Sequence, residues 1–153
     1  MNAIAEPIGH GRLVDYMSRT IQSVDLDATL KEAAGLLEQW HVGSLLVRKG
    51  SRYIGIVTDT DLSRKAVAKG LDVWTTTVNT CMTKPLISLD QREEMSVAIE
   101  LMKEHGIRHL VVTEANQVIG VLSVSDIVRY YSDLIPAVQD LARLTNSGPE
   151  VAS

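Results

Sequence analysis

Two short motifs place a hydroxyl three residues before a carboxylate: Thr58 with Asp61, and Ser123 with Asp126. Each follows an apolar run and precedes an amphipathic segment. At such a junction the spacing is typical of a capping box, in which both side chains satisfy backbone N–H groups of a first helical turn. The same carboxylate can also accept charge-assisted hydrogen bonds from ligand hydroxyls, beside N–H groups that suit an anion. The two roles are compatible.

The other reactive side chains show no catalytic or metal-binding pattern. His105 and His109 are four residues apart, but Gly106 and Ile107 between them predict a helix end, and no carboxylate ligands accompany them. No spacing suggests a Ser/His/Asp or Cys/His nucleophile. Cys81 is the only cysteine, which excludes an internal disulfide and multi-cysteine metal sites, and we expect a buried structural thiol. We therefore expect no catalytic residue, no metal and no enzymatic activity.

The chain repeats itself with an offset of 65 residues, without a gap, from Met17 to Arg129. Glycine, aspartate and arginine positions match as well as apolar ones, so the match is more than a shared amphipathic pattern. Identical pairs include Met17/Met82, Leu45/Leu110, Gly55/Gly120, Asp61/Asp126 and Arg64/Arg129.

Each copy predicts the order strand–helix–strand–strand–helix. Thr29 and Glu32 have capping-box spacing before the first helix, and 90–93 is a looser cap at the matched place in the second copy. Gly106 suits a helix C-terminus. In the first copy we expect strands at 21–24, 44–47 and 53–57 and a last helix at 62–69. In the second copy we expect a hairpin of strands at 109–112 and 118–122 and a last helix at 127–134.

Composition narrows the class of protein. The chain has 153 residues and a net charge of -4. Its residues are 45% hydrophobic and 22% charged, a composition that excludes disordered and collagen-like proteins. No run of Lys and Arg suggests nucleic acid as a partner. No apolar stretch is long enough to span a membrane, and the N-terminus lacks the pattern of a secretory signal. We expect a cytoplasmic protein with no membrane partner.

Taken together, the ordered motifs resemble a tandem pair of CBS domains, also called a Bateman module. The resemblance covers about residues 12–134, with a first repeat at 12–70, a linker at 71–77, a second repeat at 78–134, and flexible termini at 1–11 and 145–153. The matching segments are Val78–Thr83, Ala98–Met102, Ile107–Val112, and the Gly-x-x-Thr/Ser-x-x-Asp motifs at Gly55–Asp61 and Gly120–Asp126.

This resemblance implies an α/β fold in which two β-α-β-β-α repeats pack as one pseudo-two-fold-symmetric module with clefts between them. It also implies a regulatory module that binds adenosine-containing ligands, forms a homodimer and signals in trans to a protein partner. AMP, ADP and ATP are the first candidate ligands, and NAD or S-adenosylmethionine are further ones. The alternative is a ligand-independent dimerisation or protein-interaction module.

The resemblance further implies roles for named residues. Asp61 and Asp126, with Thr58 and Ser123, would hold ribose hydroxyls. Arg108 and His109 would reach phosphates, although a solvated charge at a helix–strand junction is an equal alternative, and Arg64, Lys65 and Arg129 are secondary candidates. Asp59 stands where the second copy has Val124, so we expect two clefts of different affinity. The remaining expected contacts, on residues that otherwise belong to the core or to strand ends, are Thr20, Ile21, Val42, Pro85, Leu86 and Ile107.

Overall fold

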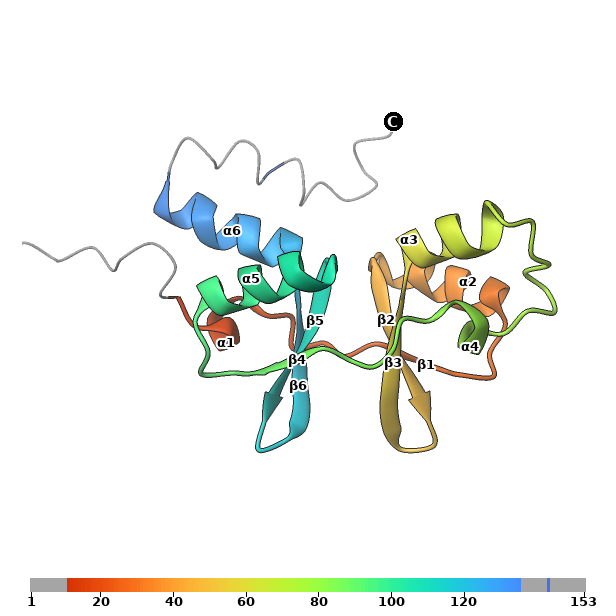
Figure 1. Cartoon of the computed structure of the whole chain (residues 1–153), viewed down its shortest axis with the longest axis horizontal. Coiled ribbons are helices and arrows are strands. Elements are labelled where there is room, and N and C mark those ends of the chain that lie inside the picture. The colour runs from red at the N-terminus through yellow and green to blue at the C-terminus, as the bar shows by residue number, and fades with distance from the viewer. Residues whose placement is uncertain (1–10, 136–142, 144–153) are drawn as a thin grey trace, which may run out of the picture. The chain divides into compact units, whose positions relative to one another are not determined.

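The computed structural model describes residues 11–135 and Arg143 (Figure 1). The described residues fall into two compact units, one of residues 21–87 and one of residues 11–20 with 88–135. We call these the 21–87 unit and the 88–135 unit, the latter including residues 11–20. The termini expected to be flexible lie outside the described residues, apart from Gly11. No helix among the described residues has both the length and the apolar character needed to cross a membrane.

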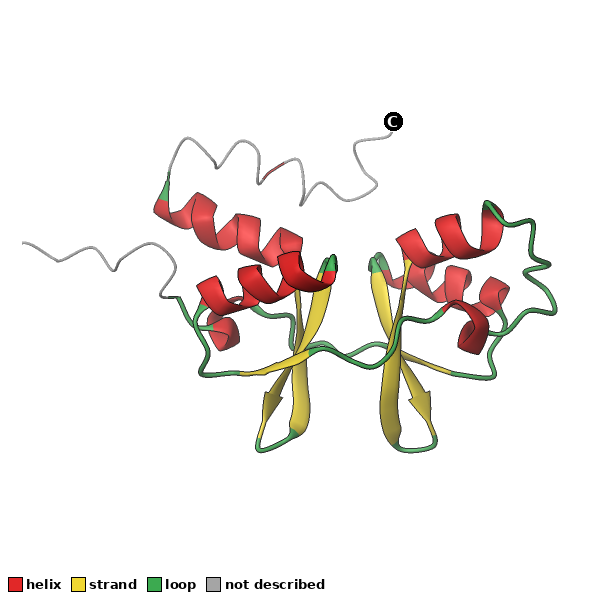
Figure 2. Ribbon diagram, in the orientation of Figure 1, coloured by secondary structure: helices red, strands yellow, loops and turns green. Residues whose placement is uncertain are grey.

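The 21–87 unit carries one three-stranded sheet in the order β1-β2-β3 (Figure 2). β1 is parallel to β2, and β2 is antiparallel to β3. α2 contacts both β2 and the π-helical segment η1. The elements are β1 (Ser23–Asp25), α2 (Leu30–Trp40), β2 (Ser44–Lys49), β3 (Arg52–Thr58), α3 (Asp59–Asp61), η1 (Leu62–Val67) and α4 (Val78–Cys81).

The 88–135 unit repeats this order with its own sheet, β4-β5-β6, in which β4 is parallel to β5 and β5 antiparallel to β6. The predicted order strand–helix–strand–strand–helix is therefore confirmed in both copies, and so is the α/β class. The elements are α1 (Leu13–Tyr16), β4 (Ser88–Asp90), α5 (Met95–His105), β5 (His109–Glu114), β6 (Gln117–Ser123) and α6 (Val124–Leu134).

Local sequence signals mark the start of α2 and the end of α5, but not the start of α5. The Thr29–Glu32 capping box is confirmed at α2, where each side chain accepts a hydrogen bond from the other residue's backbone N–H. Gly106 ends α5 in the left-handed conformation, with φ of 61°. The looser cap predicted at 90–93 is wrong. α5 begins at Met95 after an N-cap, Glu94, whose side chain makes no capping bond.

Asp90 instead holds the turn before α5. Its carboxylate accepts hydrogen bonds from both the backbone N–H and the Nε of Arg92, each at 2.9 Å. These bonds hold the pKa of Asp90 below its usual value. A carboxylate that bonds two residues ahead favours a turn over a helix start, which explains the later beginning of α5.

The last helix of the first copy differs from the single helix predicted at 62–69. It starts earlier, as α3, and continues as the π-helical η1. In the second copy α6 is a regular α-helix that starts at Val124, three residues before the predicted start. In both copies the capping box therefore begins the helix directly at the strand end.

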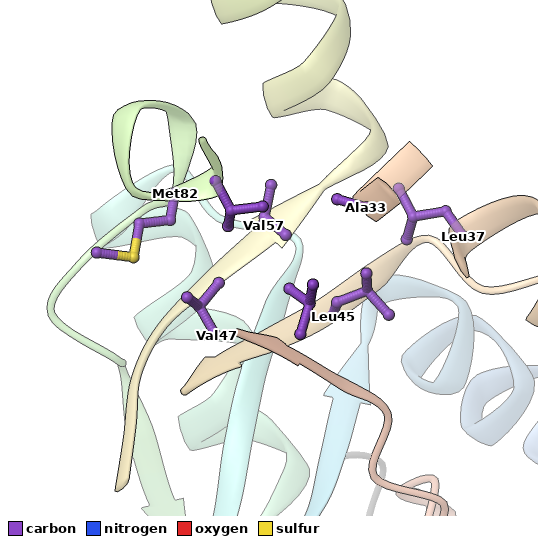
Figure 3. Close-up of a cluster of buried hydrophobic side chains, with 8 residues drawn as sticks. Ala33, Leu37, Leu45, Val47, Val57 and Met82 are labelled. Atoms are coloured by element: carbon purple, nitrogen blue, oxygen red, sulfur yellow. The ribbon is translucent and has the colours of Figure 1, made fainter. Parts of the chain in front are cut away.

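Buried apolar side chains from the sheet, from α2 and from residues 78–82 form the core of the 21–87 unit (Figure 3). α2 supplies Ala33 and Leu37, and Leu30 is buried in a neighbouring cluster with Ala66 and Cys81. Burial of such side chains is the main stabilising contribution to each unit. The members of the main cluster are Val24, Ala33, Leu37, Leu45, Val47, Val57, Val78 and Met82.

Each unit also contains a short segment that belongs to the other sequence repeat. We call residues 12–20 and 78–87 the lead-in segments, because they lead into β1 and β4. Ser18 exchanges two backbone hydrogen bonds with Val121 of β6, and Thr83 exchanges two with Ile56 of β3. The repeats predicted at 12–70 and 78–134 therefore exchange their first segments in space, which sequence similarity alone does not indicate.

Candidate functional site

The Thr58–Asp61 motif lies where β3 passes into α3. The Asp61 N–H donates to Thr58 Oγ1 at 3.1 Å, and the Thr58 N–H donates to Asp61 Oδ2 at 3.0 Å. Asp61 is only 7% exposed, one of two buried polar residues among the described part of the chain. The capping role is thus confirmed, and it holds the carboxylate in a fixed orientation at a helix N-terminus.

The other side of the Asp61 carboxylate faces a lysine and a threonine. Lys65 Nζ is 2.8 Å from Asp61 Oδ1, and Thr83 Oγ1 donates to the same oxygen at 3.3 Å. Lys65 also donates to the carbonyl of Cys81 at 3.2 Å and to Thr83 Oγ1 at 3.1 Å. Lys65 is therefore more than a surface charge, because it joins the aspartate to the lead-in segment.

Ser123 and Asp126 form the equivalent motif between β6 and α6. The Ser123 N–H donates to Asp126 Oδ2 at 2.8 Å, and the Ser123 hydroxyl donates to the same oxygen at 3.0 Å. Arg129 Nη2 is 3.4 Å from Asp126 Oδ1 and donates to the carbonyl of Tyr16 at 2.6 Å. A basic side chain again joins the aspartate to a lead-in segment.

The basic residue sits at a different spacing in the two units. Lys65 is four residues after Asp61, whereas Arg129 is three residues after Asp126. The π-helical turn of η1 holds more residues than an α-helical turn, so a residue one position later reaches the same place. Arg64, the sequence counterpart of Arg129, is exposed.

Arg108 and His109 lie next to the Ser123–Asp126 motif. The β5–β6 register places His109 opposite Ser123, and the Arg108 carbonyl accepts a hydrogen bond from the Val124 N–H at 3.0 Å. Arg108 is exposed and His109 is half-buried. The structure thus brings both predicted basic residues to the start of α6, beside Asp126.

The 21–87 unit has the same geometry with different residues. Ser44 pairs with Thr58, and the Gly43 carbonyl accepts from the Asp59 N–H at 3.1 Å. The Asp59 carboxylate, which stands where the other unit has Val124, accepts from the Thr60 N–H at 2.8 Å. The 21–87 unit therefore has a carboxylate at the position of Val124 and no basic side chain at the positions of Arg108 and His109.

The other predicted contacts are less closely tied to the two motifs. Val42 directly precedes Gly43, and Ile107 directly precedes Arg108. Both side chains are half-buried, and Val42 packs against the core cluster. The remaining four lie on the segments that precede β1 and β4, where Ile21 and Leu86 are half-buried and Thr20 and Pro85 exposed. A ligand role for these residues stays a prediction.

The described residues include no group of three or more His, Cys, Asp or Glu side chains that could hold a metal ion. His105 is the last residue of α5 and His109 the first of β5, with the left-handed Gly106 between them. The two histidines therefore do not share a helix face.

Cys81 is fully buried, and this burial raises the pKa of its thiol. Thiolate is the reactive form, so both effects slow alkylation. We expect iodoacetamide at pH 8 to modify Cys81 of the folded protein at least about a hundredfold more slowly than that of the urea-unfolded protein. Mass spectrometry of timed samples measures both rates, and rapid modification without urea would contradict a structural thiol.

The comparisons with known proteins agree on one family. The sequence profile of the CBS domain matches residues 13–68 and 78–133. The CBS domain-containing protein YhcV of Bacillus subtilis is 30% identical over 113 residues, which are 74% of this chain and 80% of that protein.

Two further matches are an enzyme much longer than this chain and a protein whose solved structure is hexameric. The homoserine O-acetyltransferase of Methanosphaera stadtmanae is 32% identical over 130 residues, which are 84% of this chain but only 26% of that enzyme. The solved structure of a hexameric CBS-CP12 protein from bloom-forming cyanobacteria matches with a TM-score of 0.71 at 26% identity, covering 88% of this chain and 85% of that one.

Proposed function

Because this chain belongs to the CBS-domain family and carries two copies in tandem, we propose that it is a regulatory module that binds adenosine-containing nucleotides. Tandem CBS domains are generally regulatory, and they often bind nucleotides. The finer proposal is that AMP, ADP or ATP binds with its ribose on the capping aspartates. A carboxylate accepts hydrogen bonds from both hydroxyls of a ribose, and such charge-assisted bonds are about twice as strong as neutral ones.

The observation that carries this proposal is the arrangement around Asp126. His109 lies opposite Ser123, and Arg108 adjoins the first residue of α6. An oriented carboxylate therefore lies beside two basic residues and a helix N-terminus. The carboxylate suits the ribose hydroxyls, and the basic residues and the helix N-terminus suit the phosphates.

The two capping aspartates differ in the charged residues around them. Gly43, Ser44 and Asp59 occupy the matched positions near Asp61, so phosphates there meet fewer positive charges and one negative charge. Lys65 lies 2.8 Å from Asp61 Oδ1 and Thr83 donates to it, whereas Arg129 lies 3.4 Å from Asp126 Oδ1. We therefore propose that the site at Asp126 binds nucleotide more tightly. The proposed adenine-side contacts are Thr20, Ile21, Val42, Pro85, Leu86 and Ile107.

The proposed output is a change in the affinity for a protein partner, with no reaction catalysed by this chain. Ligand binding can drive such a change only if the two conformations differ in affinity for the ligand. CBS-domain proteins commonly assemble into oligomers, as the hexameric CBS-CP12 protein does. A homodimer and a cytoplasmic location are part of the proposal, and sedimentation velocity tests the first of these.

Thermal unfolding with a nucleotide panel tests the proposed function. The panel contains AMP, ADP, ATP, NAD, S-adenosylmethionine and GTP, added to protein from which bound nucleotide has been removed. A ligand at 100 times its Kd stabilises the folded state by about 2.7 kcal/mol. We expect one of AMP, ADP or ATP to raise the unfolding midpoint by roughly 5–10 °C, and GTP to leave it unchanged.

A panel in which no adenosine compound changes the midpoint would contradict the proposal. It would favour the alternative, a module whose role is dimerisation or protein interaction independent of nucleotide. A stable partner complex that is indifferent to AMP and ATP would be the positive sign of that alternative.

A further inference from the structure

In both units a basic side chain bridges the capping aspartate and a main-chain carbonyl of the lead-in segment. Lys65 contacts Asp61 and the carbonyl of Cys81, and Arg129 contacts Asp126 and the carbonyl of Tyr16. Tyr16 and Cys81 occupy matched positions of the repeat, 65 residues apart. The same bridge therefore occurs twice, although its basic residues stand at unmatched positions.

Groups of the protein itself already face both oxygens of each capping carboxylate. Asp126 Oδ2 accepts from both the N–H and the hydroxyl of Ser123, which matches its two lone pairs. Oδ1, the remaining oxygen, is the one that faces Arg129. At Asp61, Oδ1 contacts Lys65 and Thr83. A ribose that bonds one hydroxyl to each oxygen therefore displaces a Ser123 donor from Asp126 Oδ2 and competes with Arg129 for the position beside Oδ1. At Asp61 it competes with Lys65 and Thr83 for Oδ1.

We propose, on the premise of the function above, that ribose and the basic bridge compete for the aspartate, so that nucleotide binding loosens the lead-in segment. Arg129 controls residues 12–20 in this way, and Lys65 controls residues 78–87. Both are positioning residues, because they act through the lead-in segment. By linkage, whatever holds the lead-in segment in place lowers nucleotide affinity by the same factor.

The competition can act beyond the site, because each lead-in segment continues into the first strand of the other unit. Residues 12–20 belong to the 88–135 unit but continue into β1 of the 21–87 unit, and residues 78–87 likewise continue from the 21–87 unit into β4. A loosened lead-in segment therefore changes the restraint on the first strand of the opposite unit. This is a route by which nucleotide at one aspartate can alter the other unit.

Amide hydrogen exchange at Ser18 and Val121 reports on the bridge, because these two residues exchange backbone hydrogen bonds that tie the lead-in segment to β6, two residues after the Tyr16 carbonyl that Arg129 bonds. We expect Arg129→Gln to speed exchange at both amides by about tenfold, since it removes a hydrogen bond from a charged donor. Lys103→Gln is the matched control, because it removes an exposed cation of the same unit that pairs with the exposed Glu100, and it should leave exchange at both amides unchanged. Equal exchange in wild type and Arg129→Gln would overturn the bridge.

The second arm adds saturating AMP, with binding measured separately by calorimetry. We expect AMP to speed exchange at Ser18 and Val121 in the wild type while leaving the central β5 amides unchanged or slower. In Arg129→Gln, AMP should add no further increase. AMP that binds without speeding lead-in exchange would overturn the competition and leave the proposed function standing. If AMP, ADP and ATP all fail to bind in the calorimeter, the proposed function fails, and the competition falls with it.

Discussion

Replacing Asp126 with asparagine is expected to weaken binding of the preferred adenine nucleotide at the 88–135 unit by about 10- to 100-fold. Hydrogen bonds to a charged acceptor contribute about 1.5–3 kcal/mol, and the uncharged amide offers only one oxygen to the ribose. The amide oxygen can still accept from the Ser123 N–H, which bonds the carboxylate at 2.8 Å, so the helix cap is retained. Isothermal titration of both proteins with AMP and ATP measures the change.

Glu100→Gln is the control for this variant. It removes the same charge from an exposed position on α5, where Glu100 pairs only with the equally exposed Lys103. We expect wild-type affinity from it. Unchanged affinity in Asp126→Asn, with an unfolding midpoint that shows an intact fold, would contradict a ribose site at Asp126.

Replacing Gly120 with alanine is expected to reduce the free energy of unfolding by about 3 kcal/mol. A Cβ at this position would lie 2.6 Å from both the Met17 sulfur and the Ser18 carbonyl oxygen. The sulfur can rotate away, but Ser18 exchanges two hydrogen bonds with Val121 and cannot retreat without losing them. The strain therefore falls on the contact between the lead-in segment and β6. Urea unfolding followed by circular dichroism measures the loss.

Two further glycines complete the test. Gly55→Ala should have a smaller effect of the same sign, because its Cβ would lie 2.9 Å from the Met82 sulfur and the Thr83 carbonyl oxygen. Gly35, within α2, has no atom within 4 Å of the added Cβ, so Gly35→Ala should stabilise the protein by about 0.5–1 kcal/mol. A Gly120→Ala protein as stable as wild type would contradict the close approach of the lead-in segment.

The internal repeat made most of the fold predictable from sequence. Matched positions fixed two copies of the same element order, and short-range signals such as the Thr29–Glu32 capping box located helix ends. Asp90 shows the limit of such signals, because its bonds to Arg92 form a turn where capping-box spacing predicted a helix start. The π-helical form of η1 was also missed, since no local pattern in 62–67 separates it from an α-helix.

The candidate site was predictable in part. The motif spacing located Thr58, Asp61, Ser123 and Asp126, but not the donors that already bond their carboxylates. Thr83 hydrogen-bonds Asp61 from 22 residues away in the sequence, and the Tyr16 carbonyl accepts from Arg129, the partner of Asp126, from 113 residues away. Both contacts depend on the exchange of the lead-in segments. The identical pairs Met17/Met82 and Gly55/Gly120 were the available signal, because a glycine and a matched methionine are what this close approach requires.

The most direct test of a ribose site on the capping aspartates is a crystal structure of the protein grown with the nucleotide that the thermal panel selects. We predict that both ribose hydroxyls lie within hydrogen-bond distance of the Asp126 carboxylate, with the phosphates beside Arg108 and His109. A nucleotide bound elsewhere, with its ribose away from both Asp126 and Asp61, would contradict it.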